Sequence, residues 1–213
     1  MRSALMMAAK PNDIEFIVRT DDDDTYKPDI VAACHPFQRN LVYLTGERGR
    51  TSDLYNECAE GSSGDNIMLG ADDAEFMTAE WDQHLCPRDK WQDGIFCVWP
   101  VDGVNSKCTF PVIGREWYKV TGEFACTIFE HTYIDSWLHR LAAKLKRAAL
   151  VKDVMVYHHH FSLRRSEFDE NYRYRRRDDH GMQQQDHNIW RSDQAELIVR
   201  DQAALLANAM VKA

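Results

Sequence analysis

Short apolar runs alternate with longer polar segments along the first third of the chain. The runs are too brief for three helical turns and are bounded by glycine or charged residues, which is typical of buried strands. They predict strands at 14–20, 41–46 and 66–71. A helix is predicted within 47–65, with Thr51 or Ser52 as its N-cap. This order of elements predicts an α/β fold with a mainly parallel sheet and crossover helices.

The rest of the pattern predicts a single domain over residues 1–213. Residues 133–150 repeat apolar positions at helical spacing along one face, which predicts an amphipathic helix. The segment 164–188 has few apolar and many charged residues, so we expect a mobile loop there. Further predictions are helices at 2–9 and 192–211, a connection at 27–40, and strands at 94–100, 110–114 and 151–157.

Composition favours a soluble globular protein, with 44% hydrophobic and 28% charged residues. No apolar stretch approaches the roughly 20 residues of a membrane span. The first residues, MRSALMMAAKPND, are too weakly apolar for a signal peptide, so a cytoplasmic location is expected. The six cysteines occur singly, which favours buried reduced thiols over a zinc site.

Charge is negative overall but uneven along the chain. The net charge of −8 argues against broad, nonspecific binding to nucleic acid. Residues 138–165 nevertheless carry seven basic residues against one acid, Asp153. Such a run is either a solvated helix face or a surface that meets phosphate.

Acidic residues follow two of the predicted strands. Asp72, Asp73 and Glu75 follow the strand at 66–71, and the acids of 21–24 follow the strand at 14–20. If both strands lie in one parallel sheet, these acids face one crevice at its carboxyl edge. So many carboxylates repel one another unless a cation or a hydrogen-bonding ligand relieves them. A divalent metal ion is the simplest such ligand.

Three histidines, 158–160, follow the strand predicted at 151–157. Alternation along an extended chain places His158 and His160 on one face and His159 on the other. Carboxylate oxygen together with imidazole nitrogen is a suitable donor set for Mn²⁺ or a related divalent ion such as Mg²⁺, with positions left for phosphate oxygens.

Three segments together resemble GT-A glycosyltransferases, particularly family-2-like and phage or environmental members. GDNIMLGADDAEFMTAEWD (64–82) is similar to the segment in which a strand delivers the metal-binding DxD-type motif. EHTYIDSWLHRLA (130–142) is similar to the acidic acceptor-side motif before a helix. VMVYHHHF (154–161) is similar to the H-x-H after the last core strand. The resemblance covers residues 12–162 in the expected order, and it implies a Rossmann-like nucleotide-diphospho-sugar transferase sandwich.

The resemblance implies a nucleotide-sugar donor site. Asp21 and Asp22 match the acids that contact the base and ribose, and Arg50 is a candidate contact to the diphosphate. Asp72 and Asp73 match the DxD-type pair, with Asp72 assigned to a ligand hydroxyl and Asp73 to the metal.

The same resemblance assigns the remaining metal ligand and the catalytic base. His158 matches the later metal ligand, with His160 as the competing choice. Asp135 matches the base that deprotonates the acceptor hydroxyl, with Glu130 as the other candidate. An available base fits an inverting transfer.

The sequence also departs from the family pattern. The motif reads ADDAE rather than a clean DxD, which leaves the roles of Asp72, Asp73 and Glu75 open. The chain opens inside what corresponds to the helix after the family's usual first strand, so that strand is expected to be missing. Structural alternatives exist for each group: a solvated turn at 72–73, an acidic loop at 21–24, surface histidines, and a helix-dipole charge at Asp135.

These patterns favour a metal-dependent glycosyltransferase that moves a sugar from a nucleoside diphosphate to a hydroxyl acceptor. The acceptor is a glycan, a lipid carrier, a protein or a modified DNA base. One alternative is a non-catalytic nucleotide- or sugar-binding module of the same fold. Another is a sugar nucleotidyltransferase, although its usual glycine-rich basic loop is not visible in this sequence.

Overall fold

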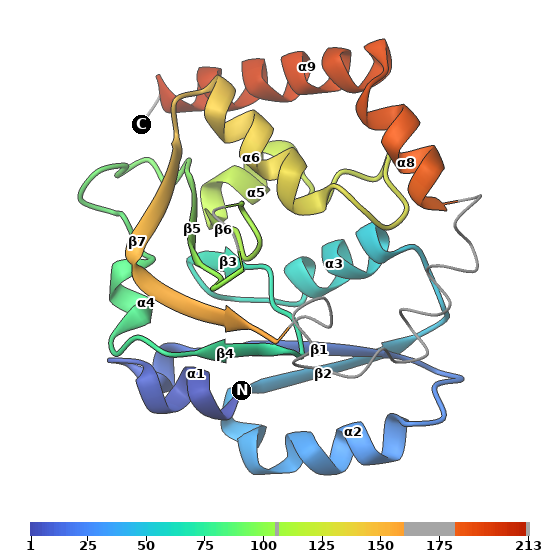
Figure 1. The fold of residues 1–213 in the computed structure, drawn as a ribbon, viewed down its shortest axis with the longest axis vertical. Coiled ribbons are helices and arrows are strands. Elements are labelled where there is room, and N and C mark those ends of the chain that lie inside the picture. The colour runs from blue at the N-terminus through green and yellow to red at the C-terminus, as the bar shows by residue number, and fades with distance from the viewer. Residues whose placement is uncertain (105–106, 160–181, 212–213) are drawn as a thin grey trace.

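The computed structural model of the chain describes residues 1–104, 107–159 and 182–211 (Figure 1). The strands are β1 (Phe16–Asp21), β2 (Leu41–Gly46), β3 (Asn66–Met68), β4 (Ala74–Phe76), β5 (Cys97–Val101), β6 (Val112–Gly114) and β7 (Ala148–His158). The helices are α1 (Arg2–Met7), α2 (Lys27–Cys34), α3 (Thr51–Glu60), α4 (Trp81–His84), α5 (Arg115–Thr121), α6 (Ile134–Lys144), α8 (Met182–Trp190) and α9 (Asp193–Met210), with 3₁₀ helices at Pro11–Asp13 and His35–Asn40. The α/β class is therefore confirmed.

The strands form two separate sheets. Strands β1 and β2 pair in parallel by themselves, and the second sheet has the order β3-β6-β5-β7-β4. Within that second sheet, β5 and β7 are parallel, whereas the pairs β3–β6, β5–β6 and β4–β7 are antiparallel. The prediction of a mainly parallel central sheet is thus wrong for the larger sheet. The expected common edge for the acids after β1 and β3 does not form, because these two strands belong to different sheets.

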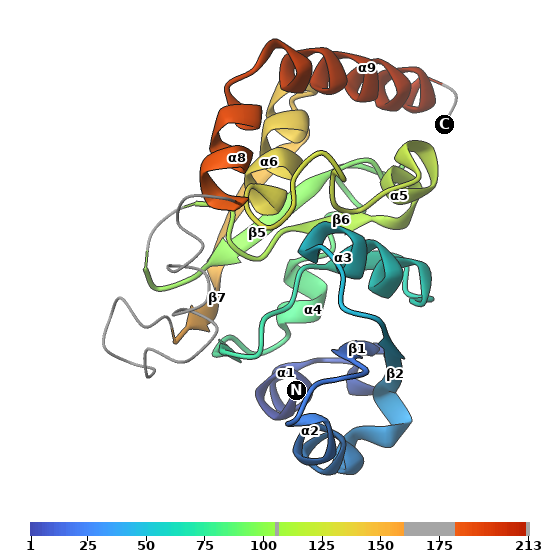
Figure 2. The same ribbon diagram turned by 90° about the vertical axis from the view of Figure 1, so that its right-hand side faces the viewer.

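Alternating side chains of the larger sheet build a core on each of its faces. Cys97, Trp99 and Ile113 belong to one core with residues of α5, α6 and α9. Val98 and Val112 belong to the other core, together with residues of α1, α4 and β7. Figure 2 shows α9 as the outer layer over α5 and α6, and α3 and α2 on opposite sides of the β1–β2 pair.

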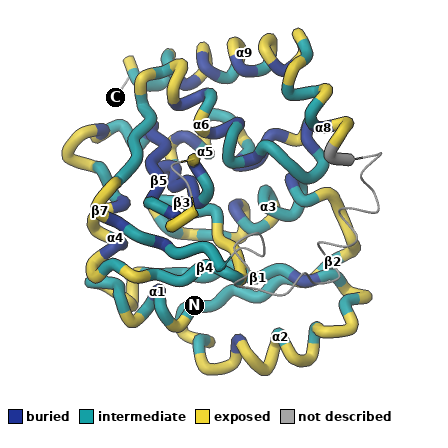
Figure 3. The backbone as a smooth tube through the Cα atoms, viewed as in Figure 1, coloured by how far each residue is buried: buried dark blue, intermediate teal, exposed yellow. Residues whose placement is uncertain are grey.

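Some predicted boundaries are wrong. The connection predicted at 27–40 contains α2 and a 3₁₀ helix. Figure 3 shows α2 exposed over most of its length, and among its residues Cys34 is buried. The predicted strand at 66–71 ends at Met68, and a turn then leads into β4. Part of the loop predicted at 164–188 lies outside the described residues, and the remainder, from Met182, is helical.

The expectation of buried thiols is confirmed for four of the six cysteines. Cys34, Cys97, Cys108 and Cys126 are buried, and Cys58 and Cys86 are half-buried; all six are free. Burial raises the pKa of Cys126 to about 12, so its thiol is protonated and unreactive near neutral pH. Among the described residues, no helix has the length and apolar character needed to cross a membrane.

Candidate functional site

The antiparallel pairing of β4 with β7 brings Asp73 and His158 together. Ala74 is the register partner of His158, so the residue just before β4 lies beside the last residue of β7. The Oδ2 atom of Asp73 lies 3.2 Å from Nε2 of His158. The main chain closes the same corner, because the amide of His159 donates to the carbonyl oxygen of Asp73 at 2.9 Å.

His158 lies among carboxylates, which favour the protonated form of its imidazole. The hydrogen bond with Asp73 raises the pKa of His158 above its ordinary value; partial burial opposes this, and the charges of Asp102 and Asp72 add to it. The ring also lies edge-on to Phe110, with ring centroids 5.2 Å apart. A proton held between an imidazole and a carboxylate occupies the place that a cation takes when it is bound by both.

Asp102 supports this corner and was not singled out from the sequence. Its carbonyl oxygen accepts from the amide of His158 at 3.0 Å. Its carboxylate is 1% exposed and accepts from the amide of Val104 at 2.8 Å and from the hydroxyl of Thr109 at 2.6 Å. In the sequence, an aspartate followed by Gly103 at the end of a strand indicates an ordinary turn. The role of Asp102 is therefore seen only in its tertiary contacts.

A second histidine–carboxylate pair, His159 with Glu75, lies next to the first. His159 Nε2 lies 2.7 Å from Oε2 of Glu75. The expected alternation of His158 and His159 therefore agrees with their different partners. Glu75 contacts His159 and not the Asp73–His158 pair. This favours Asp72 and Asp73 over Glu75 as candidate metal ligands of the motif.

The residues at this corner fit a divalent cation in part. Asp73 supplies carboxylate oxygen and His158 imidazole nitrogen, and the exposed Asp72 adjoins them. In the described part of the chain, no group of three or more such side chains is arranged to hold a metal. His160 lies outside the described residues. Mg²⁺ and similar ions commonly use one or two carboxylates and complete their coordination with substrate phosphates and water, which is the fit available here.

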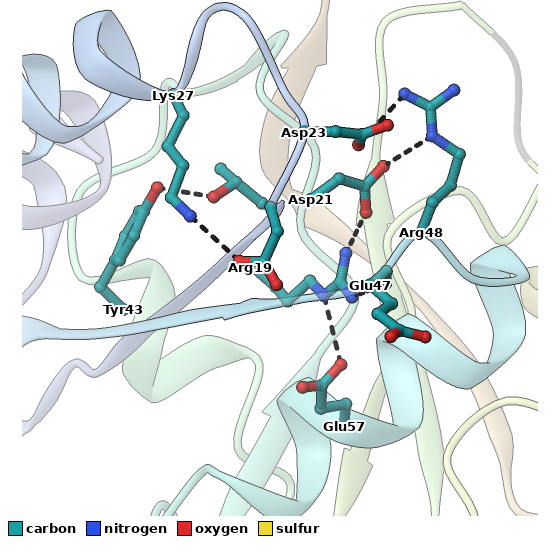
Figure 4. A network of polar contacts seen from close by, with 10 residues as sticks. Arg19, Asp21, Asp23, Lys27, Tyr43, Glu47, Arg48 and Glu57 are labelled. Carbon is teal, nitrogen blue, oxygen red and sulfur yellow. Dashed lines mark hydrogen bonds and ion pairs between the residues drawn. The ribbon is translucent and has the colours of Figure 1, made fainter.

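A second group of charges lies at the ends of β1 and β2 (Figure 4). Arg19, whose side chain is 5% exposed, donates to Asp21, to Oε2 of Glu57 at 3.2 Å, and to the carbonyl oxygen of Glu47. Arg48 contacts Asp21 from the solvent side, with 3.4 Å between Nε and Oδ2. Arg19 thus fixes the position of Asp21, a role that no local sequence pattern indicates.

Asp22 faces solvent beside the same group. Its Oδ1 atom accepts from Nζ of Lys27 at 3.1 Å, and its amide donates to the carbonyl oxygen of Gly46 at 2.8 Å. Hydrogen bonds from Lys27 and Thr45 lower the pKa of Asp22 below its ordinary value. Asp21 and Asp22 therefore lie next to each other at the carboxyl end of β1.

Arg50 and Glu130 are brought near each other by α3. Arg50 is the residue before the first turn of α3, and its guanidinium donates to Asp53 at 2.7 and 2.9 Å and to the carbonyl oxygen of Thr127 at 3.0 Å. Its pKa is raised, chiefly by the bonds with Asp53, with a further contribution from the charge of Glu130. The predicted diphosphate contact and the second candidate base therefore share one region.

Asp135 lies in the first turn of α6. Its Oδ1 atom accepts from the amide of Ser136 at 2.6 Å. Burial raises the pKa of Asp135, whereas the bonds from Ser136 and the charge of Lys107 oppose that change. A carboxyl group with a raised pKa is better matched to proton abstraction near neutral pH than an ordinary aspartate.

One cavity of about 360 Å³ lies apart from all of these groups, lined by residues that include Trp91, Phe96 and Arg115. No predicted site residue lines it. Among its lining residues, Arg88 pairs with Asp65, and Lys119 Nζ lies 2.6 Å from Oε1 of Glu116.

Comparison with solved structures shows that the fold of this chain is similar to that of a solved glycosyltransferase. The chain is similar to the mannosyltransferase PcManGT from Pyrobaculum calidifontis, solved in complex with GDP-Man and Mn²⁺. The match has a TM-score of 0.61 and 16% sequence identity, and it covers 96% of this chain and 67% of that one. At this identity the similarity shows the fold. The sequence matches no protein-family model and no curated protein.

Proposed function

We propose that the protein is a metal-dependent GT-A glycosyltransferase, which transfers a sugar from a nucleoside diphosphate to a hydroxyl acceptor. The observation that carries the proposal is the Asp73–His158 pair, at 3.2 Å, in a fold similar to that of an enzyme solved with GDP-Man and Mn²⁺. GDP-mannose is therefore the first donor to test.

In this proposal the donor is bound from two sides. Asp21 and Asp22 contact the base and ribose, and Arg50 the diphosphate. Asp72 binds a donor hydroxyl, while Asp73 and His158 hold the cation, with His160 as a further candidate ligand. Mn²⁺ or Mg²⁺, when bound there, supplies positive charge that stabilises the leaving nucleoside diphosphate.

The acceptor side consists of Asp135, with Glu130 as the alternative base. Asp135 accepts the proton of the acceptor hydroxyl, and its raised pKa suits that role. Attack by an activated hydroxyl directly on the anomeric carbon inverts its configuration, so we expect an inverting transfer. The electrostatic interaction between Arg50 and Glu130 supports placing the donor and acceptor sides next to each other in this proposal.

Calorimetric titration of GDP and UDP, each with and without Mn²⁺, tests the donor site. We expect binding of one nucleotide that depends on Mn²⁺, followed by slow release of mannose when GDP-mannose is supplied with Mn²⁺ but no acceptor. Metal-dependent binding without turnover of any sugar nucleotide would favour a binding module. No binding under any condition would contradict the donor site.

A further inference from the structure

The carboxylate of Asp186 is buried against the segment that leads into α6. Asp186 lies on α8 and is 0% exposed. Its Oδ1 atom accepts from the amide of Glu130 at 2.8 Å, and Oδ2 accepts from the amides of His131 at 2.9 Å and Thr132 at 2.7 Å. Oδ2 also accepts from the hydroxyl of Thr132 at 3.0 Å.

These contacts satisfy an otherwise costly group. A buried carboxylate is unfavourable unless hydrogen bonds replace its lost hydration. Three consecutive main-chain amides and one hydroxyl do so for Asp186, and such charge-assisted bonds are stronger than neutral ones. The benefit is mutual, because these part-buried amides lie in a loop outside any helix or strand and need a hydrogen-bond acceptor. The contact therefore fixes the main chain of residues 130–132.

Neighbouring side chains of α8 hold the next residue. Tyr133 has a left-handed backbone, with φ of 69°, and enters α6 directly. Its hydroxyl lies 2.6 Å from Nδ1 of His187, and its ring stacks on Trp190 with centroids 5.0 Å apart. Figure 1 shows α8 beside the loop that enters α6.

The amino terminus of α3 holds the same segment from another direction. The hydroxyl of Ser52 donates to the carbonyl oxygen of Phe129 at 2.6 Å. The hydroxyl of Thr51 lies 2.6 Å from Nδ1 of His131. The segment 129–133 is thus fixed between α3, which follows Arg50, and α8.

We propose that Asp186 is a positioning residue for the acceptor side of the site. By fixing residues 130–132, it sets the place of Glu130 and of the first turn of α6, where Asp135 lies. The inference rests on the proposed function, since Glu130 and Asp135 are its candidate bases. It assigns to α8 a role in proton abstraction rather than in donor binding.

Hydrogen exchange of Asp186→Asn tests the anchoring without any substrate. Asparagine keeps the shape but loses the charge and one acceptor. We expect amides 130–132 to exchange roughly tenfold faster or more, with peptides of α5 unchanged. Asp201→Asn is the matched control, because Asp201 lies exposed on α9 and pairs with the adjacent Arg200. Unchanged exchange at 130–132 would overturn the proposal.

Kinetics with GDP-mannose and Mn²⁺ test the catalytic consequence. We expect Asp186→Asn to lower kcat about tenfold or more through misplacement of the base, with donor KM changed less than about twofold. An active wild type with unchanged kcat in the variant would overturn the inference alone. A wild type inactive with every sugar nucleotide would instead overturn the proposed function, and the positioning role of Asp186 with it. If Asp186→Asn does not fold, Thr132→Val removes one of the four contacts, and a smaller effect of the same kind is expected.

Discussion

Asp73 and His158 lie 3.2 Å apart across the paired strands β4 and β7, although they are distant in the sequence. Their proximity depends on strand register, because Ala74 pairs with His158 and thereby places Asp73 at the corner. A slip of one residue would turn His158 to the opposite face and bring His159 toward Asp73. The ladder that supports the sheet therefore also assembles the candidate cation site.

Replacing Asp73 by asparagine is expected to weaken Mn²⁺-dependent binding of nucleotide at least about tenfold. About tenfold is the lower end of the loss of metal affinity that follows mutation of a residue bonded to a metal ligand, and Asp73 is proposed to bind the metal directly. Asparagine preserves the volume but removes the charge that faces His158. Titration of GDP with and without Mn²⁺ measures the effect.

Glu75→Gln is the matched control for that substitution. Glu75 lies two residues away and contacts His159, with Nε2 and Oε2 2.7 Å apart. We expect this variant to bind Mn²⁺ and GDP like the wild type. An equal loss of affinity in both variants would show that the cation is bound by the wider acidic motif rather than by Asp73 with His158.

Asp135→Asn is expected to become more stable relative to the wild type as pH rises. Burial raises the pKa of Asp135 above its ordinary value of 3.8, so the folded protein binds the proton more tightly than the unfolded chain does. The unfolding free energy of the wild type therefore falls as pH rises from about 3.8 through the raised pKa, and this contribution is constant above it. Asparagine does not titrate and shows no such loss.

Urea unfolding of both proteins from pH 3 to pH 8 measures this difference. The unfolding free energy of the variant minus that of the wild type should be lowest at the acid end. It should rise with pH and become constant near neutral pH. A gap independent of pH would mean that Asp135 titrates in the fold as it does in the unfolded chain. The same variant should lose turnover if Asp135 is the base, while retaining Mn²⁺-dependent nucleotide binding.

Much of the element order could be predicted because local patterns determine it. The apolar run at 41–46 is strand β2 with the predicted bounds, and the amphipathic pattern of 192–211 corresponds to α9. Helix α2 was missed because Pro28 lies in its first turn and its apolar residues show no clear face. The split into two sheets could not be predicted, because strand pairing depends on contacts between distant residues.

The candidate site was predictable to a similar degree. Acids and histidines at strand ends indicated Asp73 and His158, because clustered carboxylates and imidazoles in one region are uncommon without a ligand. Arg19, Asp102 and Asp186 carry no such local pattern. Each acts through main-chain groups or partners far along the chain, so their roles appear only when the fold is known.

Arg19→Met is expected to destabilise the protein by about 1.5–3 kcal/mol, the range for hydrogen bonds to charged groups. The substitution removes bonds from a nearly buried guanidinium to Asp21, Glu57 and the carbonyl oxygen of Glu47. It also removes the buried partner of Asp21 and leaves the solvent-side contact with Arg48, so nucleotide affinity should fall. Arg200→Met is the control, since Arg200 pairs with Asp201 on the surface and such pairs contribute little. Equal unfolding free energies for the two variants would contradict the structural role of Arg19.

Gly114→Ala is expected to destabilise the fold by about 3 kcal/mol or more, the upper range for overpacking. Gly114 ends β6 and precedes α5, and a Cβ atom there would overlap the carbonyl oxygen of Gly94. Backbone atoms cannot turn aside as a flexible side chain can, so either β6 or the turn at Gly94 must shift.

Gly122→Ala separates this overlap from the ordinary effect of replacing glycine. Gly122 has φ of +73°, but its added Cβ would meet nothing within 4 Å. Its cost should be about 1–2 kcal/mol, from the left-handed backbone alone. Urea unfolding of both variants measures the difference. If Gly114→Ala proves the milder of the two, β6 and the Gly94 turn are not packed as closely as the structure describes. Strand β6, which lies between β3 and β5 in the sheet, would then hold the sheet less rigidly than we infer. The Asp73–His158 corner, which the same sheet supports, would be less rigid as well.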